Sequence, residues 1–159
     1  MSGPTCREVF AALPGAWDLD RTFEPAIGTM RGVATFTPTG DAVLAYREDG
    51  ELRRSDGFTG PVYREYRWVL VAGDTDERID VLFAADRWSG GLMHTLRLDP
   101  TGTARDVHHC DADDYTGTYA FTPPDLVVIT MDVRGPAKDY TIRTTLRRRG
   151  SPRTARSRG

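Results

Sequence analysis

Apolar and polar residues alternate with a period of two from about Ala16 almost to the end of the chain. Between residues 17 and 23, for example, Trp17, Leu19 and Phe23 are separated by polar residues. Successive side chains of an extended strand point to opposite faces, so this period is typical of strands that are buried on one side. The pattern therefore predicts an all-β fold for most of the chain.

Residues that tolerate positive φ or preset a turn divide this pattern into about ten strands. These turn signals lie at residues 38–41, 48–50, 55–57, 73–75, 99–102, 110–113, 123–125 and 134–136. Short connections make neighbouring strands antiparallel, and such strands protect their edges most simply by closing. We therefore predict a single antiparallel up-and-down β-barrel of about ten strands over residues 14–149, while a sandwich stays open as an alternative. A barrel larger than about eight strands has room for a ligand.

Two segments flank the predicted barrel. Residues 7–13 have a helical pattern between a Pro-Thr start signal and a Pro-Gly stop, so residues 1–13 are expected to form a lid or plug across one mouth. Six arginines fall in the last 13 residues: Arg147, Arg148, Arg149, Arg153, Arg156 and Arg158. The tail at residues 150–159 is expected to be disordered and solvated, with contact to RNA, an acidic partner or a membrane surface as the alternative.

Composition and charge narrow the class of protein. A length of 159 residues with 39% hydrophobic and 28% charged residues fits one globular domain. Removing the six terminal arginines leaves 15 basic and 23 acidic residues, a net charge of −8, which disfavours nucleic-acid binding. The amino terminus carries charge where a signal peptide is apolar, and no apolar run could span a membrane, so we expect a cytoplasmic protein without a membrane partner. Cys6 and Cys110 are predicted to be free thiols.

The groups with the greatest chemical potential are concentrated at residues 108–119. This stretch reads as the end of one strand, a tight acidic turn and the start of the next. Alternation puts His108 and Cys110 on one face and His109 on the other, while Tyr115 and Tyr119 share a face after the turn. We therefore predict that His108 and Tyr119 face a cavity and that His109 faces solvent.

The more apolar face of each predicted strand also contains an unusual number of polar groups. A row of leucines from Leu92 to Leu98 includes His94, for example. The predicted inward polar set is Arg21, Tyr46, Glu48, Arg64, Tyr66, His94, His108, Tyr115, Tyr119, Lys138 and Tyr140. Each such group costs roughly 1–3 kcal/mol if it is buried without a partner. Some are expected at the rims and others in pairs, such as Glu48 with Arg64.

Several pieces of this sequence resemble a bacterial protein family. They are residues 13–17 (LPGAW), 32–38 (GVATFTP), 108–119 and 135–140 (GPAKDY), the last followed by Arg147. The family is known only as a domain of unknown function, and its members look like lipocalin-type or calycin-type barrels. The resemblance extends from about Leu13 to Arg147 and implies a barrel without implying an activity. The arginine-rich tail and the doubled His108-His109 depart from the family pattern.

Two classes of function are compatible with this interior. In the first, the barrel binds a small anionic or phenolic metabolite, whose charge contacts Arg21, Arg64 or Lys138 and whose body packs on tryptophans and tyrosines. The full set of candidate ligand-binding residues is Trp17, Arg21, Tyr46, Glu48, Arg64, Tyr66, Trp68, Cys110, Tyr115, Lys138 and Tyr140.

In the second class, the same pocket is the site of a cofactor-free isomerase, cyclase or lyase. His108 or His94 would be the general acid or base, and Asp113 would orient the histidine. Tyr119 or Lys138 would polarise a carbonyl or enolate. Both functions require a polar pocket, but catalysis also requires a specific geometry of the catalytic groups. Binding is therefore the favoured interpretation.

Named cofactor and metal motifs are missing from the sequence. There is no Gly-rich phosphate loop, nucleophile elbow, Cys-x-x-Cys or His-Glu-x-x-His. His94, His108 and Cys110 could supply three metal ligands, but a lone His-x-Cys is a weak signal. A haem held by one histidine is disfavoured by the polar, cationic interior. We therefore predict neither metal nor cofactor, and the oligomeric state stays open, a homodimer included.

Overall fold

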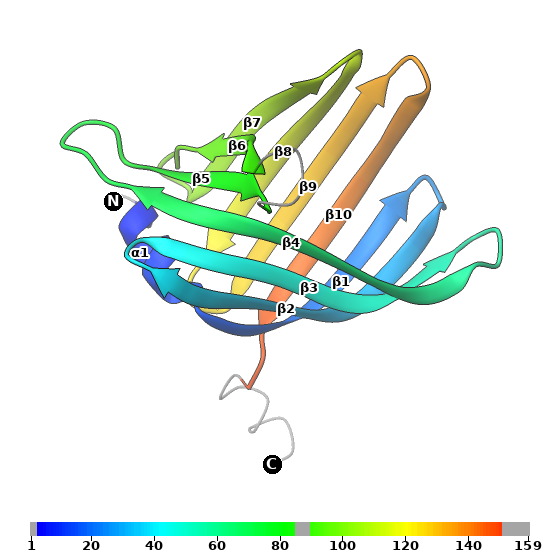
Figure 1. Cartoon of the computed structure of the whole chain (residues 1–159), viewed down its shortest axis with the longest axis horizontal. Helices are drawn as coiled ribbons and strands as arrows, with labels where there is room; N and C mark the ends of the chain where they lie inside the picture. Colours follow the sequence, from blue (N-terminus) through cyan, green and yellow to red (C-terminus); the bar gives the residue numbers. More distant parts are fainter. Residues whose placement is uncertain (1–2, 85–89, 151–159) are drawn as a thin grey trace.

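The computed structural model describes residues 3–84 and 90–150, which form one short helix and a single ten-stranded antiparallel sheet (Figure 1). The strands are β1 (Gly15–Glu24), β2 (Gly28–Gly40), β3 (Val43–Arg54), β4 (Thr59–Val71), β5 (Arg78–Phe83), β6 (Leu92–Leu96), β7 (Thr103–Cys110), β8 (Asp113–Thr122), β9 (Leu126–Gly135) and β10 (Lys138–Arg148). Their order in the sheet is β6-β5-β4-β3-β2-β1-β10-β9-β8-β7. The sheet curls until β6 lies beside β7. The predicted up-and-down barrel is confirmed, and the sandwich alternative is excluded.

The helix α1 (Cys6–Ala12) lies across one end of the barrel, beside β4 and β5 (Figure 1). Its start is fixed by a capping box, in which the Thr5 hydroxyl accepts from the Glu8 amide and the Glu8 carboxylate accepts from the Thr5 amide. Val9 and Phe10 are buried against the strands. The helix is thus the predicted one, beginning one residue earlier. No helix among the described residues is long and apolar enough to cross a membrane.

Arg148, near the end of β10, fixes the segment that follows α1. Its guanidinium donates to the carbonyl oxygens of Pro14 at 2.9 Å and Pro124 at 3.0 Å, and also to that of Ala12. The same group lies 4.2 Å from the ring centroid of Trp17. Arg148 therefore belongs to the folded barrel, although it was grouped with the terminal arginines by charge. The predicted disordered tail falls outside the described residues, apart from residue 150.

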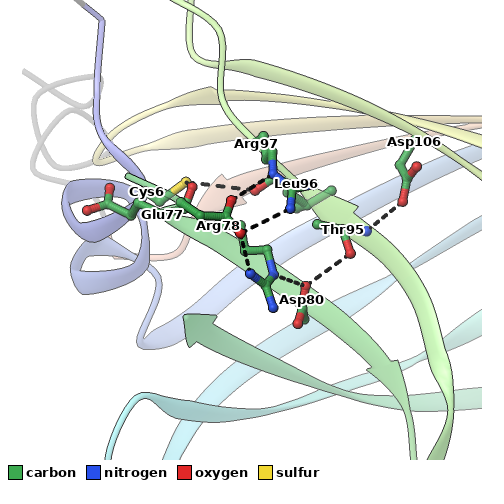
Figure 2. A network of polar contacts seen from close by, with 9 residues as sticks. Cys6, Glu77, Arg78, Asp80, Thr95, Leu96, Arg97 and Asp106 are labelled. Atoms are coloured by element: carbon green, nitrogen blue, oxygen red, sulfur yellow. Dashed lines mark hydrogen bonds and ion pairs between the residues drawn. The ribbon is translucent and has the colours of Figure 1, made fainter. Parts of the chain in front are cut away.

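The barrel has one seam, between β6 and β7. Among the described residues no backbone ladder joins these two strands. Instead, the Thr95 amide donates to the Asp106 carboxylate at 2.7 Å, and the Thr95 hydroxyl donates to Asp80 at 3.1 Å (Figure 2). Arg78 extends the network by donating to Asp80 and Asp76. Side chains thus complete a closure that backbone hydrogen bonds leave open.

Two local sequence predictions are wrong. Residues 48–50 were expected to turn but lie inside β3, whose ladders with β2 and β4 continue through them. Leu92 was expected to face inward but is 48% exposed. A bulge explains the second error: Val81 pairs with His94 while Leu82 pairs with Leu92, so one extra residue breaks the alternation.

Aromatic side chains fill the half of the barrel nearest α1. The Phe36 ring lies at the centre of this group, 6.4 Å from the Trp17 ring, 4.7 Å from Tyr46 and 5.1 Å from Trp68. Each of these four side chains is at most 3% exposed. This capped half is therefore a packed core.

Candidate functional site

A cavity of about 290 Å³ occupies the half of the barrel remote from α1. Its apolar wall is formed by Trp68, Val81, Phe83, Met93, Ile129, Met131 and Ile142. Polar groups also line it, namely Arg21, Glu48, Arg64, Glu65, Tyr66, His108, Tyr115, Tyr119, Tyr140 and Thr144. Eight of the residues that the sequence singles out thus converge on this cavity together with Trp68.

Arg21 and Glu48 form a bidentate ion pair in the cavity wall. The two Nη–Oε distances are 2.9 and 2.6 Å, and the side chains are only 10% and 4% exposed. Burial alone would lower the pKa of Arg21 and raise that of Glu48, but the partner charge outweighs it in each case. The pKa of Arg21 is therefore raised and that of Glu48 lowered, so both are charged at neutral pH.

Two neutral side chains complete this pair. The Tyr46 hydroxyl donates to Glu48 at 2.6 Å, and Arg21 Nε donates to the Thr144 hydroxyl at 2.7 Å. Burial, followed by the adjacent Glu48 charge, raises the pKa of Tyr46 well above its usual range. The predicted ion pair of Glu48 with Arg64 is wrong, because Glu48 binds Arg21 instead. Arg64 lies opposite Glu48 in the ladder, and its charge helps to lower the pKa of Glu48. The charge of Arg21 is thus fully compensated inside the protein.

Arg64 lies at the mouth of the cavity and has a different environment. The ladder between β4 and β5 ends with Tyr66 opposite Phe83, so Arg64 extends beyond β5 into an exposed position. Its guanidinium donates to the Tyr66 hydroxyl at 3.3 Å. Within residues 3–84 and 90–150 it forms no ion pair with a carboxylate. Arg64 therefore brings to the mouth a positive charge that no ion pair of the described residues neutralises, although it contributes to lowering the pKa of Glu48.

Lys138 lies at the rim and does not line the cavity. Its ammonium group donates to the Tyr115 hydroxyl at 2.8 Å and lies 3.1 Å from the Asp113 carboxylate. The Tyr115 hydroxyl and the Asp113 charge raise the pKa of Lys138 above its usual value. Asp113 is thus engaged by Lys138, and the contacts of the described residues do not join it to His108.

His94 lies behind the cavity wall, where it supports Tyr119. It is fully buried on β6, and its ring contacts two groups on β8, across the seam. Nε2 lies 3.0 Å from the Tyr115 carbonyl oxygen, and Nδ1 lies 2.7 Å from the Tyr119 hydroxyl. Burial lowers the pKa of His94, so the ring is neutral at pH 7. Tyr119 itself lines the cavity, and burial raises the pKa of its hydroxyl well above the usual value.

Gly117 makes this arrangement possible. A Cβ atom at residue 117 would lie 2.6 Å from Cε1 of His94 and 2.8 Å from Cε1 of Tyr119. Such distances are far shorter than van der Waals contact, so only glycine leaves space for the imidazole. The sequence shows a glycine on the inner face of a strand, but the collision partner comes from the opposite side of the seam.

The two adjacent histidines of β7 point in opposite directions. The ring of His108 lines the cavity between those of Phe83 and Tyr115, at centroid distances of 5.6 and 6.3 Å. Its nitrogens have no hydrogen-bond partner in the part of the chain that the structure describes. His109 is exposed and lies 2.5 Å from the Asp114 carboxylate. This is the facing that the alternation predicts.

Besides His94, Asp113 and Lys138, three further candidate residues lie away from the cavity. Trp17 packs beneath α1, where its indole N–H donates to the Leu13 carbonyl. Tyr46 stands behind Glu48, and Cys110 is partly buried at the end of β7. Met93, which the β6 bulge directs to the cavity, is a lining residue that the alternation of the sequence does not indicate. Among the described residues no three His, Cys, Asp or Glu side chains cluster as metal ligands would.

Residues 13–148 match a family model described as "Family of unknown function (DUF6314)". The chain belongs to this family. The match covers most of the chain and confirms the resemblance to a barrel family without an assigned function. A search of curated proteins finds no significant match.

Solved structures support the fold. The S-type phycobiliprotein lyase of Guillardia theta has a TM-score of 0.66 and 12% identity, covering 93% of this chain and 94% of its own. EF1p2_mFAP2b bound to DFHBI has a TM-score of 0.50 and 17% identity, covering 89% and 97%. At these identities the likeness concerns the fold alone.

Proposed function

We propose that this protein binds a small molecule with an anionic group in the cavity remote from α1. The cavity volume of about 290 Å³ is near the lower end of the roughly 300–1,000 Å³ that ligand pockets have, which suits a compact metabolite. Apolar walls with a few convergent polar groups are typical of such pockets. Two fold neighbours are a phycobiliprotein lyase and a protein bound to DFHBI, so the barrel fold is compatible with small-molecule binding.

The observation that carries this proposal is the charge of Arg64 at the mouth, which forms no ion pair within residues 3–84 and 90–150. Arg21 cannot supply a net charge, because the Glu48 carboxylate already binds both Nη atoms of its guanidinium. Lys138 is engaged at the rim by Asp113 and Tyr115. A carboxylate on the ligand would form a charge-assisted hydrogen bond with Arg64, while its body packs against the aromatic and methionine side chains of the wall.

A thermal-shift assay with a matched pair of probes tests the proposal. Phenylpropionate carries the anionic group, and phenylpropionamide has the same shape without the charge. Phenylpropionate should raise the unfolding midpoint by mass action, the amide much less, and Arg64→Gln should abolish the difference. Arg105→Gln is the control, because Arg105 is exposed on β7 and does not line the cavity. Equal shifts with both probes, or an undiminished shift in Arg64→Gln, would contradict the proposal.

His108 favours a second candidate, a cofactor-free acid/base enzyme acting in the same cavity. Its imidazole lines the cavity and, among the described residues, is engaged by no other hydrogen-bonding group, so it is available to a substrate. Tyr119 suits the role of electrophile poorly, since its hydroxyl is bound by His94. Nuclear magnetic resonance of a bound ligand after incubation would show whether the ligand is chemically altered. An altered ligand, with conversion lost but binding kept in His108→Ala, would establish this function. An unaltered ligand would leave binding alone.

A further inference from the structure

The hydrogen bonds of His94 determine which role the Tyr119 hydroxyl can play toward a ligand. Nε2 of His94 lies 3.0 Å from the Tyr115 carbonyl oxygen. A carbonyl oxygen can only accept, so Nε2 must carry the hydrogen. The neutral ring then has its lone pair on Nδ1, which is the atom that faces Tyr119.

The Tyr119 hydroxyl must therefore be the donor in the 2.7 Å contact with Nδ1. A phenol has one hydrogen, and this contact uses it. Only the lone pairs of the hydroxyl oxygen remain, so in any further hydrogen bond with a ligand Tyr119 must be the acceptor. Burial of His94 keeps the ring in the neutral form on which this assignment depends.

The ring cannot easily rearrange to reverse this polarity. The missing side chain at Gly117 leaves space for the imidazole, whose Cε1 would lie 2.6 Å from a Cβ there. The other tautomer, with the hydrogen on Nδ1, would place the Nε2 lone pair against the Tyr115 carbonyl oxygen and leave that buried acceptor unsatisfied. The acceptor role of Tyr119 is thus determined by His94 on β6 and by Tyr115 and Gly117 on β8.

Tyr119 and Arg64 lie at different levels along the barrel wall. The Tyr119 ring contacts the Trp68 ring at a centroid distance of 5.9 Å. Arg64 precedes Trp68 on β4 by four residues toward the mouth. At about 3.3 Å per residue, the backbone positions of Arg64 and Trp68 are roughly 13 Å apart along the strand. A ligand that reaches both groups must be elongated, with different chemistry at its two ends.

We infer that Tyr119 is a specificity-determining residue that selects anionic ligands with a hydrogen-bond donor at the end remote from the anionic group. This inference rests on the proposed binding function and specifies its ligand class: small elongated carboxylates whose inner end carries a hydroxyl or N–H group. A hydroxyaryl carboxylate satisfies both ends. An analogue that can only accept would face the lone pairs of Tyr119 and lose a hydrogen bond.

Isothermal titration calorimetry with two probes at pH 7.5 tests the inference. Para-hydroxyphenylpropionate has the inner donor, and para-fluorophenylpropionate has a similar shape without it. We expect the wild type to bind the hydroxy probe about tenfold more tightly, the value of one good hydrogen bond. Tyr119→Phe should make the two affinities equal without weakening the fluoro probe. The control Tyr63→Phe removes a hydroxyl from an exposed tyrosine on β4 and should keep the tenfold ratio.

The outcomes separate this inference from the proposed function. If both probes bind wild type equally and both are lost in Arg64→Gln, the specificity role is wrong and the anion site stands. If the ratio persists in Tyr119→Phe, another group selects the donor and the inference is overturned. If neither probe binds, the proposed function falls with it. The wild-type ratio needs no substitution, so the inference stays testable even if Tyr119→Phe does not fold.

Discussion

The two halves of the barrel use the same strands for different purposes. Along β1, the inner row begins with Trp17 and Leu19, which are 1% and 2% exposed in the half capped by α1. Two residues further the row reaches Arg21, whose guanidinium lines the cavity in the open half. Along β4, the row changes in the same way from Trp68 to Arg64 at the mouth.

This difference separates stability from binding. The capped half buries aromatic rings against one another, and burial of large apolar side chains is the dominant stabilising term in folding. The open half has empty volume and holds its shape by hydrogen bonds and by the Arg21–Glu48 pair. A barrel divided in this way can vary its cavity lining without losing its core. Substitutions in the two halves should therefore have different consequences.

The largest expected effect is in the capped half. Trp17→Ala removes a ring that is 1% exposed and packed on Phe36, so it should destabilise the protein by about 3–5 kcal/mol. Tyr140→Ala in the open half removes a ring that borders empty space and should cost less than about 1 kcal/mol. Urea denaturation followed by circular dichroism measures both. Equal losses would break the proposed division.

Glu48 is the expected exception in the open half. Glu48→Gln leaves the buried Arg21 charge uncompensated and should cost about 3–5 kcal/mol, although it changes few atoms. Glu65→Gln is the matched control, because Glu65 is exposed and 3.6 Å from Arg47, and should cost less than about 1 kcal/mol. The double variant Arg21→Met/Glu48→Leu should recover much of the loss. A small effect of Glu48→Gln would mean that water reaches the pair.

Acidification should weaken the seam through His94. Its pKa is lowered by burial from 6.5, so the unfolded chain binds the proton more readily than the native protein. The contribution of neutral His94 to the free energy of unfolding is therefore fully present above pH 6.5. It is lost as the pH falls from 6.5 toward the pKa of the folded state, by at most about 1.4 kcal/mol per pH unit. Glu48, whose pKa is lowered from 4.5, loses its contribution only at lower pH. Denaturation curves at several pH values give the free energy of unfolding as a function of pH. This free energy should depend less steeply on pH in His94→Gln than in the wild type, and an unchanged dependence would contradict the buried neutral ring.

The smallest effect concerns the start of α1. Thr5→Ala removes the hydroxyl that accepts from the Glu8 amide and should cost about 1 kcal/mol. Thr37→Ala, at an exposed position on β2, should change stability by less than about 0.5 kcal/mol. Thermal denaturation can distinguish the two. If Thr5→Ala had no effect, α1 would contribute to the capped half through packing alone.

The period of two and the turn residues were sufficient to predict the barrel and most of its inner rows. They place Arg21, Glu48 and Tyr119 on inner faces because each face assignment depends only on a single strand. They could not identify the partner of Glu48. Arg64 is its direct neighbour in the ladder, but Arg21 reaches it from β1 across the intervening β2, although Arg21 itself lies opposite Met30.

Features that depend on closure were beyond the sequence. The bulge in β6 reverses the alternation at Leu92 and directs Met93 to the cavity, with no turn residue to mark it. The requirement for Gly117 arises from His94, which crosses the seam from another strand. Both depend on how distant strands meet, and the spacing of residues within one strand does not contain that information.

The most direct test of the account is to locate a bound carboxylate by nuclear magnetic resonance. With para-hydroxyphenylpropionate at saturation, intermolecular nuclear Overhauser effects should connect the probe to Ile129 and Met131 in the cavity wall. Trp17 and Phe36, in the packed capped half, should show none. Contacts confined to the cavity would support the division into a stabilising half and a binding half. Contacts to the capped half or to the outer face of the barrel would contradict it.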